Sequence, residues 1–338
     1  MVVVLVDEPG TFVGKRGRRL VLKKPDGSVK EVPIVKITEV IISTKASLST
    51  DVIRELSNNG VPILFVGKYG PIALLHPFFM HGTVITRREQ MLAFTDWRGG
   101  HLAKAFVIGG LVNKARLLKY LYKNRGDGRF EVLSETAEEV MKYVEKVKGL
   151  GDDLHRIRVH LMGLEGEATH IYYQALREVF PEWAGFEGRE KRPPRDPVNA
   201  ALSLGYTILN MRCLTAVAIS GLEPFAGFLH ADRSGKPSLI LDLAEEFRQP
   251  VVDRTVVSLF TRGVLSESDF KEEGGRIIFT ESGKVKLLGA LEQTLSQGVK
   301  MDGMKTTLGK AIIHQARNIV RFLLGRIPRY EPFTWRWW

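Results

Sequence analysis

The sequence predicts an α+β protein with a small N-terminal β-sheet domain followed by a larger all-α domain. The first 75 residues contain short β-branched runs separated by turn residues, whereas residues 90–338 carry apolar residues at helical spacing almost throughout. The length of 338 residues also exceeds one typical domain of roughly 100–200 residues. We therefore expect domains at residues 1–75 and 90–338, joined by a linker over residues 76–89.

The N-terminal domain is predicted from its β-branched runs, one turn and one helix cap. Pro25-Asp26-Gly27-Ser28 is typical of a turn, because proline presets φ and glycine accepts a positive φ. Ser49 or Thr50 caps a short helix that ends before Asn58-Asn59-Gly60. The expected strands are residues 2–6, 19–24, 29–42, 61–66 and 72–75.

The second domain is predicted to be helical, with one strand at residues 276–279 and a proline-rich loop at residues 181–197. The glycine pairs Gly99-Gly100 and Gly109-Gly110 interrupt its first helical stretch. The expected helices are residues 90–121, 134–147, 152–179, 196–220, 238–248 and 306–324.

The composition excludes several classes of protein. The single cysteine, Cys213, excludes a disulfide framework and any zinc or iron–sulfur site that needs several cysteines. We find no signal peptide and no uncharged stretch near the roughly 20 apolar residues that cross a bilayer, so we expect a cytoplasmic protein without a membrane partner. The net charge of +11 then favours nucleic acid as the partner.

Glu165 is the first candidate for chemistry. It falls inside an apolar helical stripe that runs from Leu161 to Tyr172. A carboxylate that faces a core needs a cation, a metal or a hydrogen-bond donor, because burying it unpaired costs several kcal/mol. Gly163 and Gly166 weaken the helix, which suggests that a large group or a second backbone approaches there. The alternative is a buried ion pair with arginine, with the glycines allowing close helix packing.

His230 and two further acids are the other candidates. An apolar run with glycines, residues 221–230, delivers His230 to a polar loop, and histidine serves as a metal ligand or a general base. Ser238 can cap the next helix, on which Asp242 and Glu245 are spaced to emerge side by side as oxygen ligands. The alternatives are a hydrogen-bonded structural histidine and a solvated acidic helix face.

These residues together suit one kind of site. Two carboxylates and an imidazole are a mixed oxygen and nitrogen ligand set that suits Mg²⁺ or Mn²⁺. In a basic chain, such a set would hold a metal against a phosphodiester. Spacing alone does not establish that the three segments converge. A separate feature is the end of the chain, residues 332–338, whose three tryptophans pack on a neighbouring subunit, stack on nucleic-acid bases or fold on their own domain.

Four motifs stand in a fixed order along the chain. They are Leu164-Glu165-Gly166-Glu167-Ala168 with Tyr172, Asp196-Pro197-Val198-Asn199 through Tyr206, Gly221-Leu222-Glu223-Pro224 through His230, and Ser238-Leu239 through Arg248. In order and spacing they resemble the CRISPR-associated integrase/endonuclease family, the first-numbered protein of the spacer-acquisition machinery. The resemblance covers essentially the whole chain, and it implies a β-sheet domain, a flexible linker and an all-α catalytic domain.

The resemblance also implies the roles of individual residues. The metal ligands of the family fall on Glu165, His230 and Glu245, with Mg²⁺ or Mn²⁺ as the metal. The last position is often aspartate in relatives, and Asp242 matches a second acid that supports the catalytic site. The candidate contacts to phosphate or DNA are Lys236, Ser238, Tyr206 and Arg248, and Asn199 matches a structural position.

By the same resemblance, the protein forms homodimers through its β domain and works with a small ferredoxin-like partner dimer. Its expected substrate is double-stranded DNA, namely the protospacer and the repeat array. The implied reaction is a metal-dependent transesterification in which a 3′-hydroxyl attacks a repeat phosphodiester, and water in its place gives endonuclease activity. The alternatives are a general DNA-repair nuclease and a non-catalytic DNA-binding scaffold whose acids make structural ion pairs.

Overall fold

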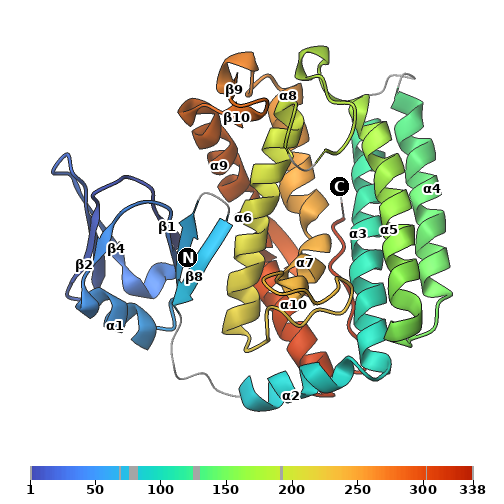
Figure 1. Ribbon diagram of the computed structural model, residues 1–338, viewed down its shortest axis with the longest axis horizontal. Helices are drawn as coiled ribbons and strands as arrows, with labels where there is room; N and C mark the ends of the chain where they lie inside the picture. Colours follow the sequence, from blue (N-terminus) through green and yellow to red (C-terminus); the bar gives the residue numbers. More distant parts are fainter. Residues whose placement is uncertain are drawn as a thin grey trace. The chain divides into compact units, whose positions relative to one another are not determined.

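The computed structural model of the chain describes residues 2–67, 70–75, 83–124, 130–190, 193–301 and 303–336. The chain divides into two compact units, residues 1–83 and residues 84–338, which we call the β unit and the helical unit. A β-sheet region therefore precedes a mostly helical domain, which confirms the predicted fold class (Figure 1). Of the expected linker, residues 76–82 lie outside the described residues, and helix α2 (Thr83–Ala93) begins within its remaining part.

The β unit contains two sheets of four strands and helix α1 (Thr50–Asn58) in its described part. One sheet has the order β1-β5-β7-β8, parallel except for β8, and the other has the order β4-β3-β2-β6. The strands are β1 (Val2–Val6), β2 (Phe12–Arg16), β3 (Arg19–Lys23), β4 (Val29–Pro33), β5 (Ile37–Ile42), β6 (Ser47–Leu48), β7 (Ile63–Gly67) and β8 (Gly70–Leu75).

Local chemistry explains these boundaries. The predicted turn joins β3 to β4, where the Ser28 N–H donates to Oδ1 of Asp26 at 2.8 Å and Gly27 has φ of 83°. Ser49 caps α1, as its hydroxyl oxygen accepts the Val52 N–H at 3.2 Å. The strand expected over residues 29–42 is split by a 3₁₀ turn, η1 (Ile34–Lys36), and β2 and β6 were not predicted.

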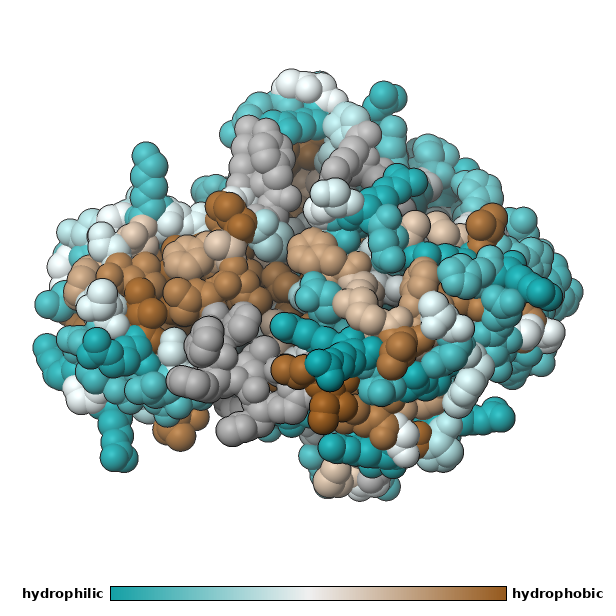
Figure 2. All heavy atoms as spheres, turned by 60° about the horizontal axis from the view of Figure 1, so that its bottom comes forward, coloured by the Kyte–Doolittle hydropathy of each residue, from teal (hydrophilic) through white to brown (hydrophobic). Residues whose placement is uncertain are grey.

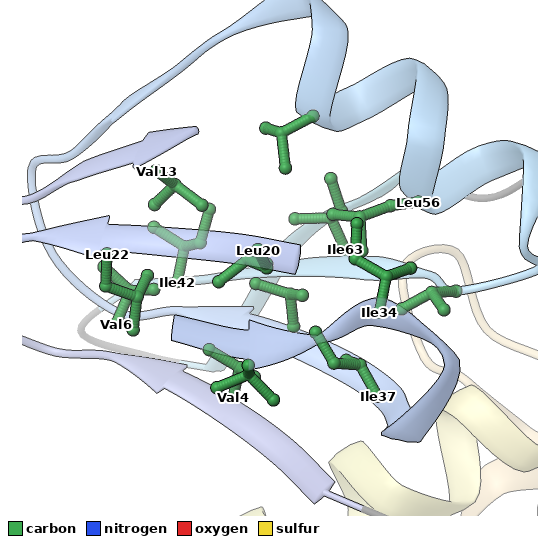
Figure 3. Packing of buried hydrophobic residues seen from close by; sticks show 14 residues of the cluster. Val4, Val6, Val13, Leu20, Leu22, Ile34, Ile37, Ile42, Leu56 and Ile63 are labelled. Carbon is green, nitrogen blue, oxygen red and sulfur yellow. The ribbon is translucent and has the colours of Figure 1, made fainter. Parts of the chain in front are cut away.

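One apolar cluster fills the β unit. It takes Val13 and Leu20 from one sheet, Ile42 and Ile63 from the other, and Leu56 from α1 (Figure 3). Apolar side chains also reach the surface of this unit, and Figure 2 shows them gathered on the face that it draws. The large exposed ones in the described part are Leu5, Phe12, Val29, Val35 and Ile72.

In the helical unit, α3, α4 and α5 lie side by side, and α6 and α7 pack against each other (Figure 1). The helices are α2, α3 (Trp97–Lys123), α4 (Glu131–Lys148), α5 (Leu154–Arg177), η3 (Glu182–Ala184), α6 (Pro197–Ile219), α7 (Ser238–Glu245), the π-helical η4 (Arg248–Asp253), α8 (Arg254–Thr261), η5 (Glu267–Asp269), α9 (Glu281–Leu295) and α10 (Leu308–Leu323). Short strands accompany them: β9 (Phe270–Glu272), β10 (Ile277–Phe279), β11 (Gly298–Met301) and β12 (Met304–Thr307). Only β10 was predicted.

The glycine pairs do not interrupt α3, contrary to the prediction. The predicted helical stretch is instead interrupted before the glycine pairs, where Asp96 caps α3 by accepting the Arg98 N–H at 2.8 Å. Gly110 lets the end of α7 approach closely, and Gly109 lies against Pro332 and Glu246. A Cβ on Gly110 would lie 3.3 Å from the carbonyl oxygen of Glu245, which is tighter than ordinary van der Waals contact. Small residues in α3 therefore bring the end of α7 against its surface.

The described end of the chain folds on its own unit, in agreement with one of the three alternatives for the tail. The buried carboxylate of Glu246 accepts the Tyr330 hydroxyl at 2.6 Å and the Phe333 N–H at 2.8 Å. Asn113 of α3 donates to the Phe333 carbonyl at 3.0 Å and accepts the Trp335 N–H at 2.8 Å. The last two tryptophans, residues 337 and 338, lie outside the described residues.

Helix α6 has the length and composition of a membrane-spanning helix, with a mean hydropathy of 1.4 over its most apolar window. Of that window, 56% is buried inside the protein, which is the environment of a core helix. It is the one helix of this kind in the part of the chain that the structure describes.

Candidate active site

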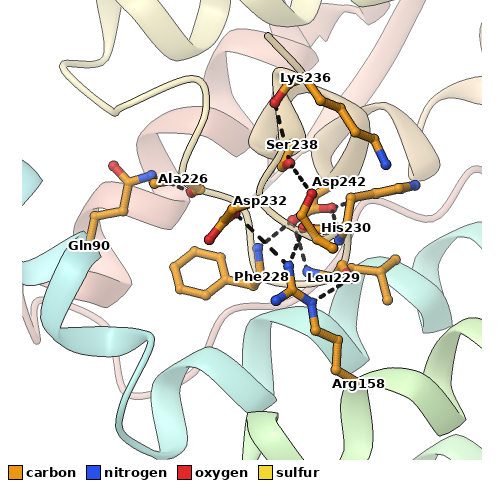
Figure 4. Close-up of polar contacts among 11 residues, drawn as sticks. Gln90, Arg158, Ala226, Phe228, Leu229, His230, Asp232, Lys236, Ser238 and Asp242 are labelled. Carbon is orange, nitrogen blue, oxygen red and sulfur yellow. Dashed lines mark hydrogen bonds and ion pairs between the residues drawn. The ribbon is translucent and has the colours of Figure 1, made fainter. Parts of the chain in front are cut away.

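Asp242 fixes the position of His230. The Asp242 carboxylate is fully buried and accepts the backbone N–H groups of Phe228 at 2.6 Å, Leu229 at 3.0 Å and His230 at 2.9 Å. Its Oδ1 also lies 2.7 Å from Nδ1 of His230 (Figure 4). Because both Asp242 oxygens accept backbone N–H groups, we assign Nδ1 as the donor in this contact. The ring is thereby held with Nε2 on its opposite side, the arrangement that presents a histidine as a metal ligand or a base.

The loop that carries His230 packs tightly against α7. A Cβ on Gly227 would lie 2.9 Å from Oδ2 of Asp242 and 2.8 Å from backbone of α7, so only glycine fits without displacement. At the other end of the loop, buried Gln90 of α2 accepts the Glu223 N–H and donates to the Ala226 carbonyl, both at 2.8 Å. Gly227, one of the glycines noted in the sequence, therefore allows this loop to pack closely against α7.

Arg158 of α5 also holds this loop, and it was not predicted from the sequence. Its Nε donates to the Leu229 carbonyl at 3.0 Å, and its Nη2 donates to the carbonyl of His230. Nη2 lies 4.0 Å from Oδ1 of Asp232 (Figure 4). Arg158 precedes Glu165 by seven residues, so the two side chains leave α5 on the same face. That spacing is the signal by which the sequence could have revealed it.

Glu165 lies on α5 with its side chain 22% exposed. Its Oε1 accepts the Thr169 hydroxyl at 2.6 Å and lies 3.3 Å from Nζ of Lys114 on α3. Burial by itself raises the pKa of Glu165, but the charge of Lys114, the Thr169 hydrogen bond and the charge of Arg248 together lower that pKa to about 2. Glu165 is therefore ionised at neutral pH, and its closest cation is a lysine where the alternative interpretation expected an arginine.

Packing among the described residues does not explain the two glycines beside Glu165. A Cβ on Gly163 or on Gly166 would meet no atom of the described residues within 4 Å. Both glycines are exposed on α5. The alternative in which they serve close helix packing is therefore wrong, and this strip of α5 is open to a group from outside the chain.

Glu245 is 2% exposed at the end of α7. Its Oε1 accepts from Nη1 of Arg248 at 2.9 Å, whereas its Oε2 is buried and has no hydrogen-bond partner in the described part of the chain. A buried carboxylate oxygen without a partner is unfavourable, so this atom fits a cation or water. Because Asp242 and Glu245 are both buried, the alternative of a solvated acidic helix face is wrong.

Two of the candidate DNA contacts also make contacts within the protein, namely Tyr206 and Arg248. The Tyr206 hydroxyl donates to buried Asp253 and lies 2.5 Å from the Tyr173 hydroxyl. The Tyr206 ring lies 5.3 Å from the Arg248 guanidinium, within reach of a cation–π contact. Desolvation lowers the pKa of Arg248, but the charge of Glu245 and other nearby groups raises it overall. Arg248 therefore stays charged at the site.

The remaining predicted residues lie around the His230 loop and the start of α6. Ser238 does not cap α7, as the cap position falls on Pro237, and its hydroxyl donates to the Ala231 carbonyl at 2.9 Å. Lys236 is half-buried in the loop (Figure 4). Asn199 accepts from Arg189 at 2.7 Å, among other contacts with the loop before α6, which are the contacts of a structural residue.

These contacts link the candidates through cations. Arg248 pairs with Glu245 and its charge helps to keep Glu165 ionised, while Arg158 ties the His230 loop to α5. Within the described ranges, no group of three His, Cys, Asp or Glu side chains is close enough to hold a metal ion in this conformation. Carboxylate and imidazole donors suit a divalent metal, but in this structure Glu165 and Glu245 face Lys114 and Arg248.

The chain thus combines a β-sheet unit with a helical unit that contains an oriented histidine and two glutamates paired with cations. The family model described as CRISPR associated protein Cas1 matches residues 4–293. The chain belongs to the Cas1 family, which confirms the resemblance inferred from the four motifs.

Curated relatives match along the whole chain. A protein of Archaeoglobus fulgidus named CRISPR-associated endonuclease Cas1 1 is 35% identical over 346 residues, covering 99% of both chains. A Thermus thermophilus protein of the same name is 36% identical over 97% of this chain and 98% of its own. Among solved structures, a casposase bound to integration product has a TM-score of 0.80 at 23% identity, over 98% of this chain and 93% of its own. A Cas1 protein from Thermotoga maritima has a TM-score of 0.78 at 21% identity, over 99% of this chain and 100% of its own.

Proposed function

We propose that this protein is a metal-dependent DNA endonuclease and integrase that inserts protospacer DNA into CRISPR repeat arrays. The observation that carries the proposal is the set of donors in the helical unit. His230 is oriented by buried Asp242, Glu165 is ionised, and Glu245 has an oxygen without a hydrogen-bond partner. The names of the curated relatives support the endonuclease activity.

Mg²⁺ or Mn²⁺ is the cation that such donors suit, and Glu165, His230 and Glu245 would hold it. The unpartnered Oε2 of Glu245 supports this assignment, because a cation would satisfy it. When bound, the cation acts as a Lewis acid that polarises the phosphodiester and lowers the pKa of the attacking hydroxyl. Asp242 and Arg158 keep the His230 ring and its loop in position.

The proposed reaction exchanges one phosphodiester for another. The 3′-oxygen of the protospacer forms a bond to a repeat phosphorus and loses its proton to solvent. The bond from that phosphorus to the repeat 3′-oxygen breaks, and the released oxygen takes up a proton. One ester replaces another, so no external energy source is needed. Arg248, charged and partly exposed beside Glu245, offsets negative charge on the phosphate oxygens. Lys236 lies in the loop before α7, and Ser238 is the first residue of that helix.

The DNA is gripped mainly through its phosphates. A net charge of +11 supports phosphate neutralisation by lysine and arginine, which makes affinity fall steeply as salt rises. The open glycine strip at Gly163 and Gly166 lies next to Glu165 and lets a DNA backbone come close to the site. Tyr206 and Arg248 contribute to this surface through their exposed parts.

The partners we propose are a second copy of the chain and a small ferredoxin-like protein. The exposed apolar side chains of the β unit, such as Val35 and Ile72, support a homodimer through that unit. A solved structure with a TM-score of 0.79, a Cas6-RT-Cas1–Cas2 complex of whose chain this one covers 36%, supports assembly with a second adaptation protein. We place this work in the cytoplasm, where the repeat array resides.

One assay separates the proposal from its alternatives. A protospacer with a labelled 3′ end is incubated with protein, Mn²⁺ and a supercoiled plasmid that carries a repeat. Covalent transfer of the label into the plasmid supports integration. Plasmid cleavage without transfer would indicate a general DNA-repair nuclease. DNA binding with neither reaction would indicate a non-catalytic scaffold.

A further inference from the structure

Lys114 is a buried lysine on α3, and its side chain ends in an ammonium group. The residue is 1% exposed, and its Nζ lies 3.3 Å from Oε1 of Glu165. Moving a charge out of water is unfavourable unless an opposite charge and hydrogen bonds compensate it. In the described part of the chain, Glu165 is the carboxylate with which Lys114 forms an ion pair. Lys114 is therefore held at this position by the proposed metal ligand itself.

Lys114 also lies close to the second proposed carboxylate ligand. A Cβ on Gly110, one turn earlier in α3, would lie 3.6 Å from Nζ of Lys114 and 3.7 Å from Cβ of Glu245. The ammonium group and Glu245 thus approach the same side of Gly110. The glycine leaves the space in which a positive charge sits between α3, α5 and the end of α7.

The chain's own cations therefore neutralise both carboxylates. Lys114 faces Glu165, and Arg248 pairs with Glu245 at 2.9 Å. Arg248 differs from Lys114 because its guanidinium also contacts the Tyr206 ring, whereas the ammonium of Lys114 is on a flexible four-carbon stem. Lys114 is the cation that can move away when another charge arrives.

We propose that Lys114 takes the place of the divalent cation in the metal-free protein and that metal binding is an exchange, in which Lys114 releases Glu165. The proposal rests on the proposed function, since it takes Glu165 as a metal ligand. It explains why the donors are present but not gathered around one point in the described residues. Under this proposal Lys114 has two opposing effects. Lys114 stabilises the metal-free fold, and it weakens the affinity of the protein for the metal.

The physical reason is the repulsion between like charges. Two positive charges a few ångströms apart at an effective dielectric constant of roughly 20 repel by several times the thermal energy. A metal ion must overcome this repulsion or displace the ammonium. Replacing Lys114 with the neutral, similarly long methionine removes the repulsion and leaves Glu165 with Thr169 and Arg248 as partners.

The test is calorimetric titration of the full-length protein with Mn²⁺ at pH 8. Lys114→Met is expected to bind Mn²⁺ roughly tenfold more tightly than wild type, a difference that reflects removal of a nearby like charge. The matched control is Lys104→Met on the same helix. Lys104 is 14% exposed and pairs with Asp152 at 2.6 Å, away from the proposed ligands, so its loss should leave Mn²⁺ affinity unchanged.

Thermal unfolding gives a second measurement that does not depend on activity. Without metal, Lys114→Met should unfold at a lower temperature than wild type, because Glu165 loses its closest cation. Saturating Mn²⁺ should raise the unfolding temperature of Lys114→Met by more than it raises that of wild type. Lys114→Arg, which keeps the charge, should show the wild-type response. If Lys114→Met does not fold without metal, recovery of its fold on addition of Mn²⁺ supports the exchange.

Two results would overturn the exchange and leave the metal site standing: Mn²⁺ affinity in Lys114→Met equal to or weaker than in wild type, or an equal gain in Lys104→Met. Absence of Mn²⁺ binding in wild type, Lys114→Met and Glu165→Gln alike would instead overturn the metal site of the proposed function, and the exchange with it. Tight binding in wild type that is lost in Glu165→Gln establishes the premise separately.

Discussion

The imidazole of His230 and the carboxylate of Asp242 are joined by a contact of 2.7 Å between Nδ1 and Oδ1. Asp242 is fully buried, and the backbone N–H groups of Phe228, Leu229 and His230 also point at it. One carboxylate thus fixes both the loop that carries the histidine and the orientation of the ring. The position of Asp242, twelve residues after His230, makes α7 the support on which this part of the site is built.

We predict that Asp242→Asn lowers integration by roughly 10–100-fold, the usual effect of removing a carboxylate that orients a ligand histidine. It should also lower the free energy of unfolding by about 1–3 kcal/mol, because the new amide NH₂ faces backbone donors. Plasmid integration and chemical denaturation measure the two effects. Asp269→Asn is the control, since Asp269 is 2% exposed and pairs with Lys286 at 2.7 Å outside the site. An equal loss of integration in both variants would contradict the orienting role.

Arg158→Met should release the His230 loop. The side chain of Arg158 donates to the carbonyls of Leu229 and His230, so its loss leaves these carbonyls without a donor and loosens the loop. We expect integration to fall roughly tenfold or more while DNA affinity at fixed salt stays within about twofold. The control is Arg156→Met on the same helix, whose side chain is 86% exposed. A loss of affinity in Arg158→Met that matches the loss of integration would show that Arg158 acts on DNA instead.

The glycines beside Glu165 give a prediction in which stability and activity change in opposite directions. A Cβ on Gly163 or Gly166 meets nothing within 4 Å in the described part of the chain, so alanine should fit at either position. Each substitution should stabilise the protein by roughly 1 kcal/mol through better helix propensity. If DNA approaches this strip, each should also reduce DNA affinity. Denaturation curves and filter binding check both, and unchanged affinity would remove the glycine strip from the DNA surface.

Glu246 makes the stability of the protein depend on pH. Burial raises the pKa of Glu246 from 4.5 to about 7, even though Tyr330, Gln315 and the Phe333 N–H hydrogen-bond to it. The unfolded chain therefore loses the Glu246 proton at lower pH than the folded chain does. Below pH 4.5, Glu246 does not make the free energy of unfolding depend on pH. As pH rises from 4.5 to 7, Glu246 lowers the free energy of unfolding progressively.

We predict that wild type loses about 3 kcal/mol of stability relative to Glu246→Gln between pH 4.5 and pH 7, in EDTA. Denaturation curves of the two proteins at matched pH values measure the difference. Parallel stability profiles over this window would show that Glu246 has the same pKa in the folded and unfolded chains.

Much of the architecture could be predicted from local sequence. The turn at Asp26-Gly27 and the cap at Ser49 are short-range features, and both hold. The errors arose where distant contacts decide the structure. Gly109 and Gly110 weaken a helix locally, yet they lie inside α3, where Gly110 packs against the end of α7 and Gly109 against Pro332 and Glu246. The short strands β11 and β12 were not predicted, and in the structure they pair antiparallel with each other.

The candidate site residues remain a prediction from the motifs, and their ion-pair partners could not be predicted from the sequence. The sequence motifs contain the candidate residues Glu165, His230, Asp242 and Glu245. The apolar stripe around Glu165 predicted that this side chain faces inward. Lys114 was not identified because it lies 51 residues before Glu165, on another helix. Which cation meets which acid depends on how α3, α5 and α7 pack together, and spacing along the chain does not contain that information.

The measurement that tests the central claim most directly is the transfer of a labelled protospacer 3′ end into a repeat-containing supercoiled plasmid. We predict transfer by wild type in Mn²⁺, loss of transfer in EDTA, and at least a hundredfold loss in both Glu165→Gln and His230→Ala, with DNA affinity largely retained. Transfer that is undiminished in EDTA, or that persists in folded Glu165→Gln, would contradict the account.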